Sequence, residues 1–410
     1  MEMDIKKAAL ALHKENRGKF AIVSKVPVSS REDLSLAYSP GVAEPCLVIA
    51  NEPEKVFEYT AKGNLVAVVS NGTAVLGLGD IGPLAAMPVM EGKAILFKKF
   101  AGIDAIPICL DTKDPDAIIE TVKLMAPTFG GINLEDIAAP QCFYIEEKLK
   151  SLLDIPVFHD DQHGTAVVAL AGLINSMAIV NKNLFDLNVV INGAGAAGTA
   201  IARLLVRIGV KNVAVLDRQG AIYQGREKLN EAKTDLAKIL PVRTGSLAEE
   251  LKGADVFIGV SSADILTAEM VKSMNKNAII FALANPNPEI KPELALESGA
   301  AIVATGRSDY PNQINNVLGF PGIFRGALAV RARGISEGMK EAAAKAIALC
   351  VKNPTSQMII PGPFDPDVPA IVARAVAEAA IREGLARTNV DLDRLREEVR
   401  SDFQAKTKEV

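Results

Sequence analysis

The segment Val189–Asp217, VVINGAGAAGTAIARLLVRIGVKNVAVLD, decides the fold that this sequence predicts. An apolar strand pattern runs into the glycine motif Gly193–Gly198, a helical pattern follows, and a second strand pattern ends at Asp217. A G-x-G-x-x-G motif alone is a weak signal, but here a strand precedes it, a helix follows it and an acid lies about 20 residues on. This order predicts a Rossmann-type unit that binds a dinucleotide.

The same motif predicts how the cofactor is held. Glycines let backbone N–H groups approach a pyrophosphate at the helix N-terminus, and the acid accepts a hydrogen bond from the ribose 2′-OH. Asp217 favours NAD, because a carboxylate repels a 2′-phosphate, although Arg218 beside it could admit NADP. The residues of this segment expected to bind the cofactor are Gly193, Gly195, Ala196, Ala197, Gly198 and Asp217.

Strand and helix patterns alternate on both sides of this segment. The other strand patterns lie at 65–70, 105–110, 130–134, 155–158, 256–260, 278–283 and 301–304. Such alternation predicts mostly parallel sheets, while Asn71-Gly72, followed by a strand-like stretch at 74–78, predicts an added antiparallel hairpin. We therefore expect an α/β protein: an N-terminal α/β domain with a mostly parallel sheet, then a Rossmann-type NAD(P)-binding domain.

The length of 410 residues allows two or three domains with substantial cores. We place the N-terminal substrate domain at 1–158, the NAD(P)-binding domain at 159–390 and a charged C-terminal tail at 391–410. Helical patterns at 337–351 and 368–383 close the second domain, and we expect them to pack back onto the rest.

Composition narrows the class of protein. A net charge of −4, 5% aromatic residues and no tryptophan argue against nucleic acid or an anionic membrane as a partner. The apolar run 165–180 is shorter than the ~20 residues of a spanning helix, so a buried helix is expected. Four scattered cysteines and a charged N-terminus without an apolar signal region indicate a reducing, cytoplasmic location.

The segment Phe158–Ala166, FHDDQHGTA, follows a strand pattern and opens a helical one. Four interpretations are open: a turn with a helix N-cap, a zinc site using the two histidines, a hard-cation site using the two aspartates, and a hinge between domains. Glu135-Asp136 ends another strand pattern, so these carboxylates can converge at one sheet edge. Carboxylate oxygens favour Mg²⁺ or Mn²⁺, and zinc would need a third ligand, for which only His13 remains as a further histidine.

Eight segments together resemble the malic enzyme family across nearly the whole chain. They are AYSPGVAEPC (37–46), LGLGDIG (76–82), EGKAILFKKFAGIDAIPICLDT (91–112), NLEDIAAPQCF (133–143), HDDQHGTA (159–166), NGAGAAGTA (192–200), ALANPNPE (282–289) and NQINNVLGFPGIFRGAL (312–328). The resemblance implies oxidative decarboxylation of malate to pyruvate and CO₂, with a divalent metal and NAD(P), by a homodimer or higher homo-oligomer.

The resemblance also implies roles for single residues. The metal ligands would be Glu135, Asp136 and Asp161. Lys93 would be the base for the malate hydroxyl and Tyr38 the acid that protonates the enolpyruvate carbon, with Asp160 tuning Lys93. Without the resemblance, Lys93 reads as a lysine whose charged end reaches solvent and Tyr38 as a packed tyrosine. The residues expected to contact substrate are Lys93, Asn285, Asn315 and Asn316, and Asn285 is also expected at the cofactor.

The sequence departs from the family pattern at two points, and two other functions remain possible alternatives. Residues 61–65 lack the arginine that larger relatives place before the LGLGD segment to hold a substrate carboxylate, and Arg325, or Lys99 of a partner subunit, could substitute. The chain also has no room for the acyltransferase-like domain of some relatives. A malolactic conversion with retained NAD is the nearest rival, and a non-catalytic nucleotide sensor is a rival from another class.

Overall fold

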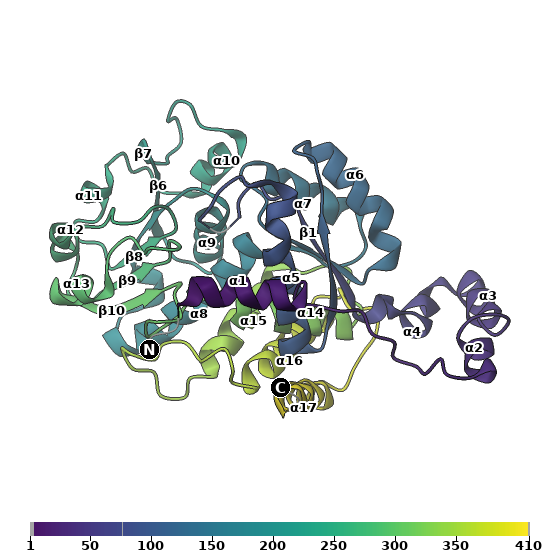
Figure 1. Ribbon diagram of the computed structural model, residues 1–410. Helices are drawn as coiled ribbons and strands as arrows, with labels where there is room; N and C mark the ends of the chain where they lie inside the picture. Colours follow the sequence, from purple (N-terminus) through teal and green to yellow (C-terminus); the bar gives the residue numbers. More distant parts are fainter. Residues whose placement is uncertain (1–3, 76, 409–410) are drawn as a thin grey trace.

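Two sheets organise the protein, which is described by a computed structural model over residues 4–75 and 77–408 (Figure 1). The first sheet has the order β2-β1-β3-β4, and the second has the order β10-β9-β8-β5-β6-β7. The strands are β1 Leu65–Ser70, β2 Asp104–Cys109, β3 Gly131–Leu134, β4 Val157–His159, β5 Asn188–Asn192, β6 Asn212–Asp217, β7 Gly220–Ala221, β8 Val256–Gly259, β9 Ala278–Ala282 and β10 Ala300–Thr305. Every pair of strands is parallel except β6–β7, which confirms the predicted α/β class.

The predicted hairpin around Asn71-Gly72 is wrong. Strand β1 has β2 on one side and β3 on the other, both parallel, so neither edge of β1 is free for an antiparallel partner. The segment after Gly72 instead forms a loop, in which Val75 and Gly79 make an isolated bridge. The N–H groups of Ile81 and Gly82 donate to the Gly72 carbonyl, each at 3.1 Å, and close the loop just before the next helix.

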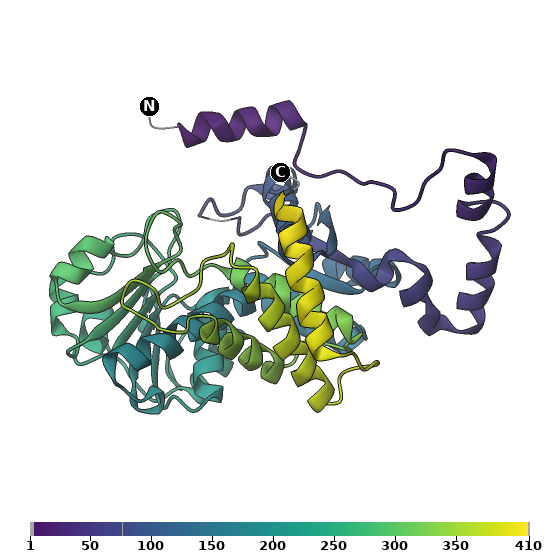
Figure 2. The same ribbon diagram turned by 90° about the horizontal axis from the view of Figure 1, so that it is seen from below.

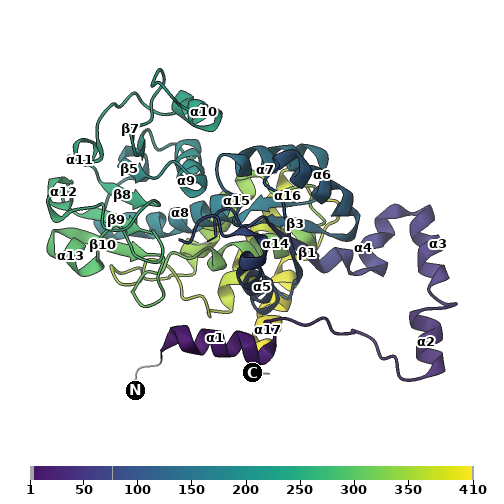
Figure 3. The same cartoon turned by 45° about the horizontal axis from the view of Figure 1, so that its top comes forward.

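Helices cover both sheets and fill the space between them. The longer ones after β1 are α5 Gly82–Ala101, α6 Pro115–Met125, α7 Gln141–Leu152, α8 Asp160–Val180, α9 Ala196–Arg207, α10 Glu231–Ile239, α14 Phe320–Ala329, α15 Glu337–Leu349, α16 Asp367–Arg382 and α17 Leu392–Lys408. Three short helices fall in the connections between successive strands of the second sheet: α11 Leu247–Glu250, α12 Ala268–Ser273 and α13 Pro292–Glu297. Figure 3 shows α8 and α15 between the two sheets.

Helix α8 begins in the FHDDQHGTA segment and runs through the core. Its length and apolar composition would suffice to cross a membrane, yet 72% of its most apolar window is buried inside the protein. The glycine at position 172 lets the ring of Phe281 from β9 approach, because an added Cβ would lie 3.3 Å from that ring. This agrees with the predicted buried helix, and it makes α8 the link between the two sheets.

The segment predicted as a charged tail forms α17. Its residues Leu395, Val399 and Phe403 recur every four positions and are buried, so this helix has one apolar face among many charges. The Phe403 ring lies 5.5 Å from that of Phe100 in α5. Helix α14 packs on α5 as well, with the Phe320 ring 4.7 Å from that of Phe97. Elements late in the sequence thus complete the core around the first sheet.

The N-terminal arm, residues 4–64, lies outside this core and contacts it at a few points, for example where Lys62 Nζ donates to the Phe129 carbonyl at 2.7 Å. It contains α1 Ile5–Asn16, α2 Arg31–Ala37, α3 Ala43–Asn51 and α4 Val56–Tyr59, and none of these helices has a buried residue. In Figure 2 the arm runs from α1 around one side of the molecule and extends away from both sheets. Asp4 caps α1, accepting from Lys7 N at 3.3 Å.

Candidate functional site

A buried lysine lies between two carboxylates where α5, β3 and α8 meet. Lys93 Nζ is 2.9 Å from Glu135 Oε1 and 2.5 Å from Asp160 Oδ2, and its side chain is 7% exposed. The ammonium group also lies over the ring of Phe320, 4.3 Å from the centroid. Lys93 therefore does not extend to solvent, which contradicts the interpretation of this residue as a surface lysine.

Lys93, Glu135 and Asp160 shift one another's pKa values. Burial lowers the pKa of Lys93, but attraction to Asp160 and Glu135 outweighs burial and raises it above the usual lysine range. Burial likewise raises the pKa of Glu135 well above its usual value, against the opposing effect of Lys93. The pKa of Asp160 is raised for the same reason. Of the four carboxylates gathered here, Glu135 and Asp160 contact Lys93 directly, and Asp161 adds a weaker attraction.

The three predicted metal ligands come together at this place. One ligand oxygen from each of Glu135, Asp136 and Asp161 lies within 4.8 Å of the others. The backbone holds the arrangement, because Asp136 has a left-handed φ of 52° and its N–H donates to Asp161 Oδ2 at 2.9 Å. An all-oxygen, strongly negative set is the donor chemistry that Mg²⁺ and Mn²⁺ prefer. The residues present therefore fit a hard divalent cation.

Two neighbours of this cluster were missed in the sequence. Asn133 in β3 donates from Nδ2 to Glu135 Oε2 at 2.8 Å, so both oxygens of Glu135 are held. Gly164, one turn after Asp160, leaves space for that carboxylate, since an added Cβ would lie 1.9 Å from Asp160 Oδ1 and 3.0 Å from the Asn316 Cβ. Asn316 thus lies beside Asp160, where substrate contact was predicted. A lone asparagine and a lone glycine carry no signal in the sequence that would predict these contacts.

The other predicted substrate residues are placed differently. Asn285 follows β9, and its carbonyl oxygen lies at the loop before α5, 2.3 Å from an added Cβ at Gly77. Its side-chain amide lies against Gly306, with Nδ2 3.1 Å from an added Cβ there. Asn315 uses its side chain locally, accepting from Val317 N at 3.0 Å as the N-cap of a short 3₁₀ turn. Arg325 donates to Asn64 Oδ1 at 2.8 Å.

The glycine motif has the geometry that dinucleotide binding requires. Gly193 has φ +122°, and an added Cβ would lie 2.6 Å from the Val260 carbonyl oxygen. An added Cβ at Gly198 would lie 1.7 Å from the Gly193 carbonyl oxygen, so helix α9 packs directly on the turn. Gly195 has nothing within 4 Å of its Cβ position, which leaves the approach to the N-terminus of α9 open. Each glycine thus serves a separate need.

Asp217 ends β6 as predicted, but its oxygens are already occupied. Arg226 donates to Oδ1 at 3.0 Å and to Oδ2 at 2.6 Å, Lys233 donates to Oδ2 at 2.6 Å, and Gln219 N donates to Oδ1 at 2.9 Å. Partial burial would raise the pKa of Asp217, but the bonds from Arg226 and Lys233 hold it far below its usual range. Four donors fill the roughly four acceptor positions of a carboxylate.

Tyr38 is the one predicted catalytic residue that the fold does not bring to the cluster. It ends α2 in the N-terminal arm, and its side chain is 68% exposed. Figure 1 shows α2 and α3 well away from α5, β1 and the rest of the first sheet. The other two predicted catalytic residues, Lys93 and Asp160, come from α5 and α8.

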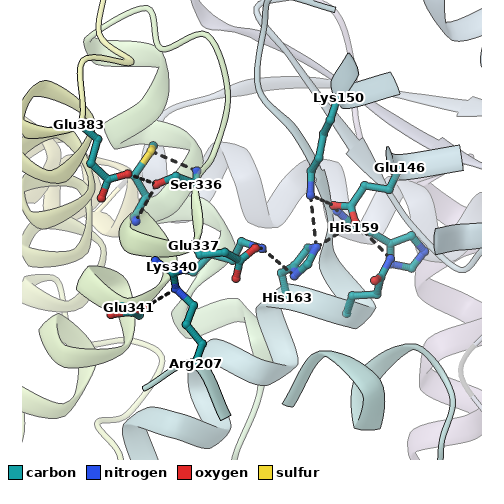
Figure 4. Close-up of polar contacts among 12 residues, drawn as sticks. Glu146, Lys150, His159, His163, Arg207, Ser336, Glu337, Lys340, Glu341 and Glu383 are labelled. Atoms are coloured by element: carbon teal, nitrogen blue, oxygen red, sulfur yellow. Dashed lines mark hydrogen bonds and ion pairs between the residues drawn. The ribbon is translucent and has the colours of Figure 1, made fainter. Parts of the chain in front are cut away.

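The two histidines of FHDDQHGTA are held differently, and neither belongs to the cluster of candidate metal ligands found among the described residues. Neither ring nitrogen of the buried His159 has a hydrogen-bond partner in the part of the chain that the structure describes, and its Nδ1 lies 3.9 Å from Asp161 Oδ2. His163 Nε2 is 2.9 Å from Glu146 Oε2, and its Nδ1 is 3.0 Å from Lys340 Nζ (Figure 4). Both ring nitrogens are therefore engaged. Burial lowers the pKa of His163 to about 4 against the opposing effect of Glu146, so the imidazole is neutral at neutral pH.

Comparison with known proteins gives matches over both sheets. Two family models match: malic enzyme, N-terminal domain, at residues 17–150, and malic enzyme, NAD binding domain, at residues 162–381. The bifunctional malic/malolactic enzyme of Bacillus subtilis (strain 168) is 58% identical over 97% of this chain and 98% of its own. The NADP-dependent malic enzyme of Escherichia coli (strain K12) is 51% identical over 96% of this chain and 54% of its own. The crystal structure of malic enzyme from Pyrococcus horikoshii superposes with a TM-score of 0.95 at 52% identity, over 98% of this chain and 97% of its own.

Proposed function

This chain belongs to the malic enzyme family, and from that premise we propose that it oxidises and decarboxylates (S)-malate to pyruvate and CO₂ while reducing NAD(P). The observation that carries the proposal is Lys93, buried between Asp160 and Glu135 beside a set of carboxylates that fits a divalent cation. A non-catalytic nucleotide sensor has no need for this arrangement, which costs energy because each buried charge loses its hydration.

We propose that the protein's own groups move the two protons. Lys93 would take the proton from the C2 hydroxyl as the C2 hydride leaves for the nicotinamide. It must first lose its own proton, and a cation bound at Glu135 would favour this loss by weakening one of the two attractions that raise the Lys93 pKa. After CO₂ leaves, Tyr38 donates its phenolic proton to C3 of the enolate, which gives pyruvate. Asp160 keeps the Lys93 amine in place throughout, because their hydrogen bond of 2.5 Å fixes the direction of Nζ.

The proposed metal ligands are Glu135, Asp136 and Asp161. A divalent cation bound there would supply polarisation of the C2 oxygen of malate and stabilisation of the enolate, and Glu135 would then be shared between the cation and Lys93. Glu135 is a member of this ligand set and also pairs with Lys93, so it links the base to the metal site. Asn316, beside Asp160, and Asn285, at the end of β9, are proposed to orient the substrate.

Malate-dependent reduction of NAD and NADP, followed by nicotinamide absorbance with and without EDTA, tests this function. We expect pyruvate in equal amount to the reduced cofactor, and EDTA should lower the rate about a hundredfold or more, because several kcal/mol of transition-state stabilisation are lost. Excess Mg²⁺ or Mn²⁺ should restore the rate, while binding of reduced cofactor stays unchanged. Full activity in EDTA would exclude the metal, and no malate-dependent reduction would exclude the oxidative reaction.

A second candidate function is the malolactic conversion, because the Bacillus subtilis relative is named a bifunctional malic/malolactic enzyme. The two reactions differ in what happens to the hydride after decarboxylation. Lactate formed without net release of reduced cofactor would identify the malolactic reaction, and pyruvate with stoichiometric reduced cofactor the oxidative one. Assaying both products in the same samples separates the two.

We propose that the partners of Asp217 let the enzyme use NADP as well as NAD. With Arg226 and Lys233 the group carries a net charge of about +1, which offsets the repulsion expected from Asp217 alone. Lys233→Gln is expected to move the NAD/NADP ratio of kcat/KM about tenfold toward NAD, since one charged hydrogen bond to a 2′-phosphate is lost. Asp217→Ala should move the ratio toward NADP.

The matched control for Lys233→Gln is Lys238→Gln. Lys238 lies on the same helix α10 and pairs with Asp235 at the surface, so its loss should leave the ratio unchanged. Equal losses with both cofactors in Lys233→Gln would mean that Lys233 only stabilises the fold around Asp217.

We propose that Tyr38 reaches the active site of a second copy of this chain. The arm that carries Tyr38 has apolar side chains exposed to solvent, among them Ile22 at 82% and Leu36 at 72%. The loop and helix start in front of Lys93 also expose apolar side chains, with Leu78 at 68% and Leu84 at 87%. Mutual docking of arms on these surfaces would bury both patches and supply each site with an acid.

We further propose a division into domains near residue 158, with the Rossmann-type domain following, and a cytoplasmic location. The division is supported by the two family models, because the first ends at residue 150 and the second begins at residue 162. Supporting the location, the apolar helix α8 is buried inside the protein.

A further inference from the structure

A chain of polar contacts joins the first turn of α8 to α7 and α15, through residues to which the proposed mechanism gives no role. Glu146 belongs to α7, His163 to α8 and Lys340 to α15, so the contacts join three separate helices (Figure 4). His163 stands between the other two, with its Nε2 2.9 Å from Glu146 Oε2 and its Nδ1 3.0 Å from Lys340 Nζ. Lys340 is 2% exposed and Glu146 is 5% exposed.

The chemistry of the three side chains decides which group donates and which accepts in each hydrogen bond of this chain of contacts. The Lys340 amine group donates to the imidazole, so Nδ1 must be the accepting nitrogen. The Glu146 carboxylate only accepts and is the nearer neighbour of Nε2, at 2.9 Å, so Nε2 carries the proton. Lys150 Nζ is 3.5 Å from Nε2 and pairs instead with Glu146 Oε1 at 2.7 Å. The imidazole is thereby fixed in one tautomer and one orientation. A side chain that cannot accept on one side and donate on the other would remove one hydrogen bond from Lys340, which also donates to Glu337 Oε1 at 2.5 Å, and one from Glu146.

Glu146 also holds the beginning of α8. The residue before the helix, His159, provides no side-chain cap, but its N–H donates to Glu146 Oε1 at 3.0 Å. Gln162 Nε2 donates to Glu146 Oε2 at 3.3 Å. A carboxylate at a helix N-terminus satisfies unpaired N–H groups and interacts favourably with the helix dipole. Glu146, from α7, thus replaces the missing cap of α8.

The same first turn carries Asp160 and Asp161 on its other side. Asp160 contacts Lys93, and Asp161 accepts from Asp136 N within the proposed metal cluster. We propose that His163 is a positioning residue, which, through Lys340 and Glu146, fixes the first turn of α8 so that Asp160 and Asp161 face Lys93 and the metal. This inference rests on the proposed function, because it presumes that Asp161 is a ligand.

Two variants remove the contacts and one retains them. His163→Leu loses both hydrogen bonds, and Lys340→Met loses the donor to Nδ1. His163→Gln keeps one acceptor and one donor at the end of a side chain of similar reach. The control is Lys182→Met, just beyond the C-terminal end of α8, where Lys182 pairs with Asp255 at 2.6 Å. That end lies about 30 Å from Asp161, given the length of the 21-residue helix.

The readouts are the dissociation constant of Mn²⁺ by electron paramagnetic resonance, the affinity for NADH by fluorescence, and kcat. We expect His163→Leu and Lys340→Met to weaken Mn²⁺ binding and lower kcat by about 10- to 100-fold, as for groups that orient metal ligands. NADH affinity should stay within about twofold, because the glycine turn is elsewhere. His163→Gln should regain most of both losses, and Lys182→Met should change neither.

Unchanged Mn²⁺ affinity in His163→Leu, with or without a loss of thermal stability, would overturn the inference. So would an equal loss in His163→Gln and His163→Leu while NADH still binds. If His163→Leu does not fold, the comparison of Lys340→Met with Lys182→Met decides the same question. Asp161→Asn separates this inference from the proposed function: if it leaves Mn²⁺ binding intact, the ligand set itself is wrong.

Discussion

Lys93→Ala is expected to lower malate oxidation by about a thousandfold or more while leaving NAD(P)H binding within a few-fold. The variant removes the proposed base, and general-base catalysis contributes up to about 10⁴-fold. It also leaves Glu135 and Asp160 without the ammonium that both contact at 2.9 Å or less. Steady-state rates with malate, together with NADH titration, measure the two effects separately.

Two further variants identify what Lys93 supplies. Lys93→Arg keeps the positive charge, but a guanidinium is not deprotonated in proteins, so this variant should be as inactive as Lys93→Ala. Lys98→Ala is the control, because Lys98 lies on the same helix and pairs with Asp104 at the surface. A Lys93→Arg enzyme with near-normal kcat would show that charge, and not proton transfer, is the contribution of Lys93.

Mixing two inactive variants is expected to restore activity if Tyr38 acts across a dimer. Tyr38→Phe and Lys93→Ala should each be severely impaired as pure proteins. In a mixed dimer, one site would combine the intact Lys93 of one copy with the intact Tyr38 of the other. Random exchange gives mixed dimers half of the time, and one of their two sites is complete, so about a quarter of wild-type activity should return.

The mixing experiment has a sharp alternative outcome. If Tyr38 and Lys93 act within one chain, every site of a mixed dimer keeps one defect, and no activity returns. Subunit exchange must be shown independently, for example by mass analysis of tagged copies, so that an absence of exchange is not mistaken for this result. A monomeric protein at assay concentration would also overturn the proposed exchange of arms.

The agreement between sequence and structure is closest where a local pattern carries the signal. The glycine motif, its flanking strands and Asp217 form a continuous βαβ segment, so the spacing of residues alone specifies the turn and the helix that follows. The carboxylates at 135, 136, 160 and 161 follow strand patterns of one sheet. Parallel strands share an edge at their carboxyl ends, which is why the sequence could predict that these side chains converge.

The errors have equally physical reasons. Asn71-Gly72 favours a hairpin locally, but β1 is already paired on both sides by strands that come later in the chain. The stretch from 391 has many charges, and its apolar residues at every fourth position become informative only when α5 and α16 are there to cover them. In both cases, contacts between distant segments override the local preference.

The sequence by itself determined the class of fold and the dinucleotide turn, because these depend on patterns within short segments. It also predicted that the carboxylates at 135, 136, 160 and 161 converge, whereas the place of Lys93 among them came from the family resemblance. Only the tertiary structure decided the partners of those residues. It placed Arg226 and Lys233 on Asp217, joined Glu146, His163 and Lys340 behind α8, and left Tyr38 exposed on an arm. An ion pair between residues far apart in the chain leaves no periodic trace in the sequence, since its energy depends on distance and burial, which folding alone sets.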